Sequence, residues 1–417
     1  MKTLLIVFLL AAAMLHAQES PKTWEFNGDV QLRGELDGRD FYNTTYPSYV
    51  TTMRTRIGVT RTFGEKVTFF AQFQDSRTFG QGITTSAYLA NVDMHQVYLR
   101  FNDVFALPLD IQAGRFKYSF GNERLFGNSD WGPIGRSYDG LLLSLDMPWK
   151  TDFIIANIHE VEKYVSNATP GSYVYPALRD SSVNMIAVTV KGKLNESNTL
   201  SLEGYYESDR KVPNGIDQQL ARYTLGAEHN YMMKPFSTVV EFIYQGGTIG
   251  AKDVSAYLVS VSAAYSMGTS KFTPGIDLLS GTNPTELTKY NSFDAAFGTG
   301  HKFYGFMDYF TSIPANTGNL GLQDIFLNYD YAPENSPFLY SAAFHHLASA
   351  EESAAGESVF GQELDLTIRY TVTKGVNLFW GGSVFLPGEL MKTRFAKGGS
   401  TELDPSFWSY LMIKAAL

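Results

Sequence analysis

The sequence predicts an all-β protein, a single-chain antiparallel transmembrane β-barrel of about 18 strands, and three observations support this class. Beyond the N-terminus no window holds 18 consecutive apolar residues, which excludes a helical membrane protein. Apolar and polar residues instead alternate over stretches of ten to thirteen residues, which is longer than the strands of soluble sandwiches. The connections between these stretches are alternately short and long, as the periplasmic turns and extracellular loops of outer-membrane barrels are.

The N-terminal segment, residues 1–17, has the features of a signal peptide. Lys2 precedes an apolar run over residues 4–15, and small Ala17 stands at the expected cleavage site. The run is too short to span a bilayer as a helix, which takes roughly 20 residues. We therefore expect export, with residues 18–417 forming one outer-membrane barrel whose formal charge changes from −9 to −10 as Lys2 is removed.

Composition excludes several other classes of protein. The chain has no cysteine, so it holds no disulfide and no thiolate metal site, and it has only 7 histidines. Its formal charge of −9 argues against a nucleic-acid binder, which needs a basic surface. The chain also contains 30 phenylalanines, 25 tyrosines and 5 tryptophans, which are residues that favour strands. No cofactor and no metal is expected.

The strands are identified by period-two alternation. In the first one, Trp24, Phe26 and Val30 share one face while Asp29 and Gln31 share the other. The pattern recurs over residues 67–74, 200–207 and 363–370. Apolar faces toward lipid and polar faces toward a watery lumen explain it. A soluble solenoid or pair of sandwiches is the alternative, and no internal repeat supports a solenoid.

The connections complete the strand count. Short turns are expected at residues 63–65, 102–108, 147–150, 194–198, 232–235, 267–270, 332–337 and 373–375. Long loops are expected at 37–48, 79–89, 118–136, 161–181, 210–219, 246–253, 281–319, 347–359 and 387–405. Eight turns and nine loops separate eighteen strands, and this even number places both termini on the short-turn side. Residues 301–310 resemble a further strand, but parity assigns them to a long loop.

A barrel of this size encloses a water-filled channel, so the inward side chains decide what passes. Inward positions carry Arg33, Arg54, Arg56, Arg100, Arg222 and Arg369. Arg54 and Arg56 share one face and would form an anion-attracting stripe. Many Asp and Glu residues occupy the same lumen, so the alternative is that these charges brace the wall as salt bridges.

The segment with the most candidate binding residues covers positions 114–140. It contains Arg115, Lys117, Arg124 and Arg136 together with aromatic residues and glycines. We expect this loop to fold into the pore, where guanidinium groups bind carboxylates and aromatic faces stack on sugar rings. The alternative is an extracellular loop that is packed for its own stability.

This segment resembles outer-membrane barrels that have an alginate export domain. The shared motifs are Gly114-Arg115, Phe120-Gly121-Asn122-Glu123-Arg124-Leu125, Asp130-Trp131 and Gly135-Arg136-Ser137-Tyr138-Asp139-Gly140. Later blocks at 301–310, 319–324 and 361–366 are similar in order and spacing. The chain departs from the family pattern at Phe120, where Tyr is favoured, and at Leu417, where a terminal aromatic residue is common.

The resemblance implies an eighteen-stranded barrel whose arginine-lined lumen passes an anionic polysaccharide, alginate in the named case. It assigns Arg115, Arg124 and Arg136 to binding in the pore. The inward-face pattern adds Arg54, Arg56 and Arg100. A monomer in the outer membrane of a Gram-negative cell is implied as well.

The expected function is a passive channel for anionic saccharides or small organic anions. A general diffusion porin of weak cation preference is one alternative, and a receptor or structural barrel plugged by residues 281–319 is another. An enzyme is not expected, because the chain has neither a Gly-x-Ser-x-Gly nor a His-Glu-x-x-His motif. His345 and His346 point to opposite faces of one strand and cannot bind one metal together.

Overall fold

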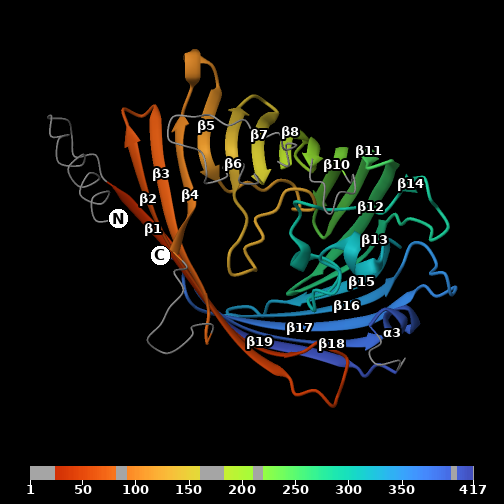
Figure 1. Ribbon diagram of the computed structural model, residues 1–417. Coiled ribbons are helices and arrows are strands. Elements are labelled where there is room, and N and C mark those ends of the chain that lie inside the picture. The colour runs from red at the N-terminus through yellow and green to blue at the C-terminus, as the bar shows by residue number, and fades with distance from the viewer. Residues whose placement is uncertain (1–23, 81–91, 160–182, 210–218, 396–401, 417) are drawn as a thin grey trace, which may run out of the picture.

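The computed structural model describes residues 24–80, 92–159, 183–209, 219–395 and 402–416, and these form a closed antiparallel β-barrel (Figure 1). This confirms the predicted fold class. The signal peptide at 1–17 and the loop at 161–181 lie outside the described residues, as do most of 79–89 and 210–219 and part of 387–405.

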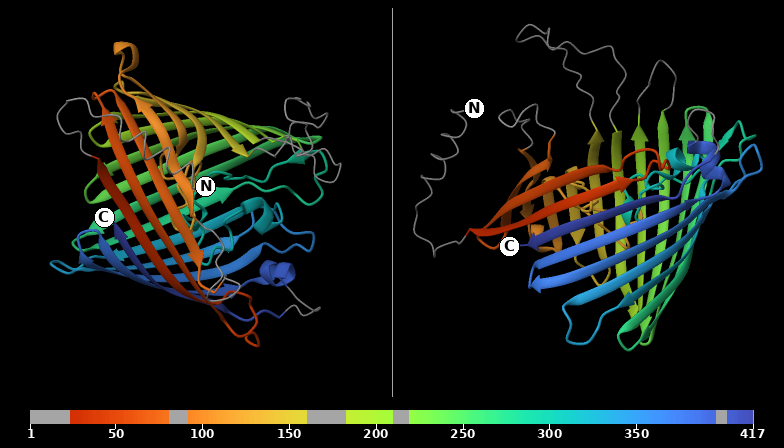
Figure 2. Two further views of the ribbon diagram at one scale, coloured as in Figure 1. Left: turned by 60° about the vertical axis from the view of Figure 1, so that its left-hand side comes forward. Right: turned by 90° about the horizontal axis from the view of Figure 1, so that it is seen from below.

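The wall consists of long, tilted strands (Figure 2). They are β1 (Glu25–Gly38), β2 (Ser48–Phe63), β3 (Val67–Thr78), β4 (Val92–Phe101), β5 (Leu109–Phe116), β6 (Tyr138–Leu145), β7 (Lys150–His159), β8 (Val183–Asn195), β9 (Asn198–Asp209), β10 (Leu220–Met233), β11 (Phe236–Ile249), β12 (Lys252–Met267), β13 (Ser270–Leu279), β15 (Leu322–Tyr331), β16 (Phe338–Ala348), β17 (Val359–Thr373), β18 (Val376–Pro387) and β19 (Ser406–Ala416). The connections contain η1 (Val104–Ala106), β14 (Lys289–Tyr290), η3 (Gly300–Lys302), α2 (Ile313–Thr317) and α3 (Glu389–Phe395). In the described part of the chain, no helix has the length and apolar character needed to cross a bilayer.

The first and last strands close the barrel. Strand β1 pairs with β19 from Asp29 opposite Ala416 to Gly38 opposite Phe407. The Ala416 amide donates to the carbonyl of Gly375, 2.9 Å away, in a short turn. The described ends of the barrel therefore lie on the short-turn side, as predicted. Closure leaves none of the described strands with an unpaired edge toward lipid.

All eight predicted short turns are confirmed, but the long loop predicted at 246–253 is wrong. Strand β11 ends at Ile249 and β12 begins at Lys252, so only two residues connect them. Gly246 and Gly247 suggested a loop, yet both lie within β11. A Cβ on Gly246 would lie 2.3 Å from the Tyr223 hydroxyl, and one on Gly247 would lie 2.0 Å from the Ala221 carbonyl oxygen. These glycines permit close approach of the neighbouring strand rather than chain reversal.

Two connections fold into the ring of strands (Figure 1). We call residues 117–137 the first inner loop and residues 291–321 the second inner loop. Residues 301–310 belong to the second and form no strand, which confirms the parity argument. Phe126 of the first loop and Phe297 of the second pack edge-on against Tyr205 of the wall, with ring centroids 5.5 and 5.4 Å apart. Buried apolar surface inside the barrel thus fixes both loops.

Candidate functional site

The first inner loop meets the wall at β2. Arg54 donates through Nη1 to the carbonyl oxygens of Asp130, at 3.1 Å, and Gly132, at 3.0 Å. Arg56 donates through Nη1 to Asp130 Oδ1, at 2.8 Å, and through Nη2 to the Ile134 carbonyl, also at 2.8 Å. Both arginines are only 2% exposed. They share the inward face, as alternation predicts, and bind the loop.

Asp130 gathers basic side chains at the turn of this loop. Lys117 contacts its carboxylate together with Arg56, and Arg54 Nη1 lies 3.7 Å from Oδ1. Burial alone would raise the pKa of Asp130, but hydrogen bonds from Lys117 and Arg56 lower it to about 2. Among the described residues, these three basic side chains pair with one other carboxylate, that of Asp29, which lies 3.2 Å from Arg54 Nη2. Three cations therefore face two carboxylates.

The same loop reaches the opposite wall through Arg124. Its guanidinium lies 3.2 Å from Glu241 Oε2 on β11 and 2.5 Å from Asp277 Oδ2 on β13. It also donates to the Tyr304 hydroxyl at 2.6 Å and lies 3.8 Å from the ring centroid of Phe303. Burial alone would lower the pKa of Arg124, but Asp277, Tyr304 and Glu241 raise it, so the side chain stays charged. Arg124 therefore fixes the loop across the lumen.

Arg136 joins the two inner loops. Its Nη1 donates to the carbonyls of Gly127, at 3.1 Å, and Gly298, at 3.0 Å, and contacts the carbonyl of Phe297. Backbone carbonyls accept a guanidinium without cancelling its charge. The Thr299 amide reinforces the junction by donating to the Glu123 carbonyl at 2.9 Å.

The second inner loop is anchored to β17. The amide of Met307 donates to Glu363 Oε1 at 2.7 Å, and the amide of Phe306 donates to Asp365 Oδ2 at 3.3 Å. His301 stacks on Trp131 of the first loop, with ring centroids 3.9 Å apart and planes 7° from parallel. Each inner loop is therefore held by the other and by the wall.

The remaining two predicted arginines lie apart from this assembly. Arg100 contacts Asp110 near a short turn, with 42% of its side chain exposed. Arg115 pairs with Asp139 at 2.7 Å. The register of β5 is regular, so Arg115 faces away from buried Gln112 and Phe116. The structure thus places Arg115 on the outer face of the barrel, which corrects its inward assignment.

The sequence did not predict the acidic residues that pair with Arg124. Glu241 and Asp277 lie more than a hundred residues from Arg124, and no local pattern links them. Lys302, in a block that resembled the family, is a further luminal cation. Burial lowers the pKa of Lys302, and its Nζ donates to the Asn122 carbonyl at 2.6 Å.

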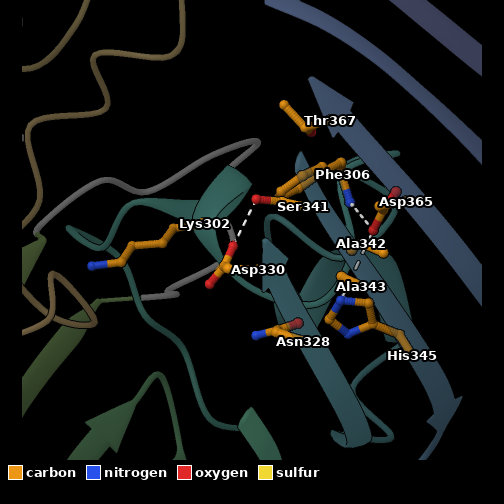
Figure 3. A pocket seen from close by; sticks show the side chains of 11 residues that line it. Lys302, Phe306, Asn328, Asp330, Ser341, Ala342, Ala343, His345, Asp365 and Thr367 are labelled. Carbon is orange, nitrogen blue, oxygen red and sulfur yellow. Dashed lines mark hydrogen bonds and ion pairs between the residues drawn. The ribbon is translucent and has the colours of Figure 1, made fainter. Parts of the chain in front are cut away.

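Two adjoining cavities lie between the second inner loop and the wall. One of about 230 Å³ is bounded by β15, β16 and β17 (Figure 3), and one of about 240 Å³ extends toward β12 and β13. Lys302, Asn328 and His345 line both. Each cavity exceeds the roughly 150 Å³ that holds a benzene molecule. They have room for small polar solutes.

The histidines of β16 diverge as predicted. His345 Nδ1 lies 2.8 Å from Asp324 Oδ2, whereas His346 Nδ1 lies 3.2 Å from Gln362 Nε2. Within the described ranges, no group of three or more His, Asp or Glu side chains is arranged to hold a metal ion.

Comparisons place this architecture among known proteins. The model of the family described as "Alginate export" matches residues 23–400. No significant match is found among curated proteins. Similar solved structures include OpdO of Pseudomonas aeruginosa, with a TM-score of 0.62 and 12% identity over 94% of this chain and 97% of that one. OccK8 (OprE) of the same organism gives a TM-score of 0.58 and 14% identity over 94% and 98%.

Proposed function

Because the chain belongs to the alginate export family and forms an outer-membrane porin-type channel, we propose that it passes small organic anions and short acidic saccharides. The solutes move down their gradient, through a monomer, past the basic groups that surround Asp130 on the first inner loop. We infer no catalytic role. The description of the family suggests an alginate-type polyuronate as a further solute.

The observation that carries this proposal is the excess of basic groups around Asp130. Arg54, Arg56 and Lys117 outnumber the carboxylates that pair with them. A low-dielectric wall concentrates such a field in the passage and raises the local concentration of anions. OpdK, one of the similar barrels, was crystallised with vanillate, an aromatic carboxylate.

The two inner loops favour small solutes over a long polymer. Both fold into the ring of strands (Figure 1). Arg56 and Arg124 tie the first inner loop to opposite walls, and Glu363 ties the second to β17. A polymer chain would have to share the lumen with both loops. A single sugar or a carboxylic acid needs much less of the space that the loops leave.

A general porin with cation preference is the second candidate function. The opposite wall is rich in buried carboxylates, among them Glu228, Glu241, Asp277, Asp324 and Asp365. Where they outweigh the arginines along the open passage, cations are attracted instead.

The reversal potential of the refolded barrel in a planar bilayer under a KCl gradient separates these functions. We expect chloride preference that weakens in Arg56→Gln and in Lys117→Gln. Arg115→Gln is the matched control, because it removes the same charge from the outer face and should leave the potential unchanged.

A preference for potassium that is the same in the native barrel and in both luminal variants would favour the cation porin. A barrel that folds but conducts no current would favour the plugged receptor.

A further inference from the structure

We propose that the cavity between the second inner loop and strands β15, β16 and β17 binds the ammonium group of a small polar solute. We call it the acidic cavity (Figure 3). It lies away from the Asp130 cluster, and its occupancy does not depend on the anion preference proposed above.

The central group is the carboxylate of Asp330 on β15. Ser341 Oγ donates to its Oδ1 at 2.6 Å. Among the described residues, no group donates a hydrogen bond to its Oδ2 and no basic side chain forms an ion pair with it. Asn328, two positions earlier on the same face, also lines the cavity. A charged acceptor and an amide oxygen thus face one space, which suits a group that has three N–H donors.

An aromatic residue also borders the cavity. Phe306 lines the cavity, and its position is fixed because its amide donates to Asp365 Oδ2. An ammonium group that reaches the free face of this ring is attracted by the ring quadrupole. Asp365 also lines the cavity, but its two oxygens accept hydrogen bonds from Ser383 and from the Phe306 amide.

Lys302 is the lysine that lines the cavity, and it does not neutralise Asp330; Lys271, opposite Asp330 on β13, forms no ion pair with it among the described residues. The stem of Lys302 lines the cavity, but its ammonium points away from Asp330 and His345 in Figure 3 and donates to the Asn122 carbonyl. His345 is occupied by Asp324, 2.8 Å away. The free charge facing the cavity is therefore that of Asp330.

The adjoining cavity provides an independent sign of a missing donor. Asp277 lines it and is 2% exposed. Its Oδ2 binds Arg124, yet its Oδ1 is buried with no hydrogen-bond partner. Leaving a buried carboxylate oxygen without a donor is costly, so a solute that brings N–H or O–H groups is favoured there. Together the two cavities fit an amine with a hydroxylated body about the size of one sugar ring.

Probes of one size and different charge test this assignment. Binding to the refolded full-length barrel is measured by titration calorimetry with glucosamine, glucose and glucuronate, at a pH where the amine is protonated. A charge-assisted hydrogen bond contributes about 1.5–3 kcal/mol, so glucosamine should bind at least about tenfold more tightly than glucose. Glucuronate should bind most weakly.

Asp330→Asn removes the charge and keeps the shape, and it should abolish the advantage of glucosamine over glucose. Asp103→Asn is the matched control, because Asp103 pairs with Lys66 on the exposed surface of a short turn. Should Asp330→Asn fail to fold, N-acetylglucosamine tests the same point on the native chain, since acetylation removes the charge.

Equal affinity for glucosamine and N-acetylglucosamine, tightest binding by glucuronate, or an unchanged advantage in Asp330→Asn would overturn the proposal. The KCl reversal potential is a separate readout. Loss of anion preference with glucosamine binding retained would refute the proposed function alone.

Discussion

The luminal arginines of β2 bind the first inner loop, so their charge acts on the passage as a field and not through free side chains. Arg54 and Arg56 were expected inward on one face, and both lie there. A guanidinium in a confined lumen is stabilised only where acceptors surround it, and loop carbonyls supply them. Alternation predicts which way a side chain points. It contains no information about a partner on a distant loop.

Arg124 should be the residue on which docking of the first inner loop depends most. Arg124→Met leaves Glu241 and Asp277 buried without their cation, and breaking a buried pair costs about 3–5 kcal/mol. Protease cleavage within residues 117–137 should accelerate by roughly a hundredfold or more while the wall stays protected. Arg115→Met, at an exposed pair, serves as control and should change docking by less than about 1 kcal/mol. Equal cleavage rates in the two variants would contradict this role.

Asp130 makes loop docking sensitive to strong acid only. Its pKa is lowered from 3.8 to about 2, so its contribution is complete above 3.8 and disappears as pH falls through about 2. Trp131 fluorescence should therefore be constant in mild acid and change only below about 3.8. Asp130→Asn should lack this transition. A transition of equal size in that variant would show that another group is responsible.

At the scale of the element, strands and turns could be predicted because lipid imposes a regular constraint. Outward positions must be apolar, so period two extends over whole strands, and every short turn interrupts it. The exception at 246–253 has a local cause. A pair of glycines such as Gly246 and Gly247 is typical of a loop. Only the structure shows that they allow β10 to approach β11 closely. The course of the inner loops depends on contacts between segments far apart in sequence, which no periodicity encodes.

Gly247 tests this interpretation of β11. Its φ is +126°, and a Cβ would lie 2.0 Å from a backbone carbonyl oxygen. Gly247→Ala should destabilise the barrel by about 1–3 kcal/mol, seen as a lower urea midpoint for unfolding in micelles. Gly34→Ala, whose nearest neighbour is 3.8 Å away, should leave that midpoint close to the native one. If the two midpoints agree, the close contact at Gly247 has no importance for stability.

For the whole molecule, charge is separated across the lumen. Basic groups gather beside β2, and carboxylates gather on β10 to β17. Such a field acts over a distance set by salt, because the screening length falls from about 10 Å at 0.1 M to about 3 Å at 1 M. This separation of charge follows from the charges of the inward-facing side chains in each strand. It can therefore be predicted in part from the sequence. The acidic cavity is not, since it needs the second inner loop in place.

Ion selectivity should consequently decline with ionic strength. Between about 0.1 and 1 M KCl, at a fixed concentration ratio, the reversal potential of the native barrel should fall toward zero. Conductance measured in the same series separates this effect from blockage. A reversal potential that is independent of salt would mean that size rather than charge selects.

The pairing of β1 with β19 makes the order of the strands cyclic. Asp29 lies opposite Ala416, so a short linker between the described ends would join them without moving either strand. New termini could then be opened in any connection outside the lumen, and every strand pair would be kept. Where the polypeptide starts is therefore a matter of synthesis and export, while the finished ring has no first strand.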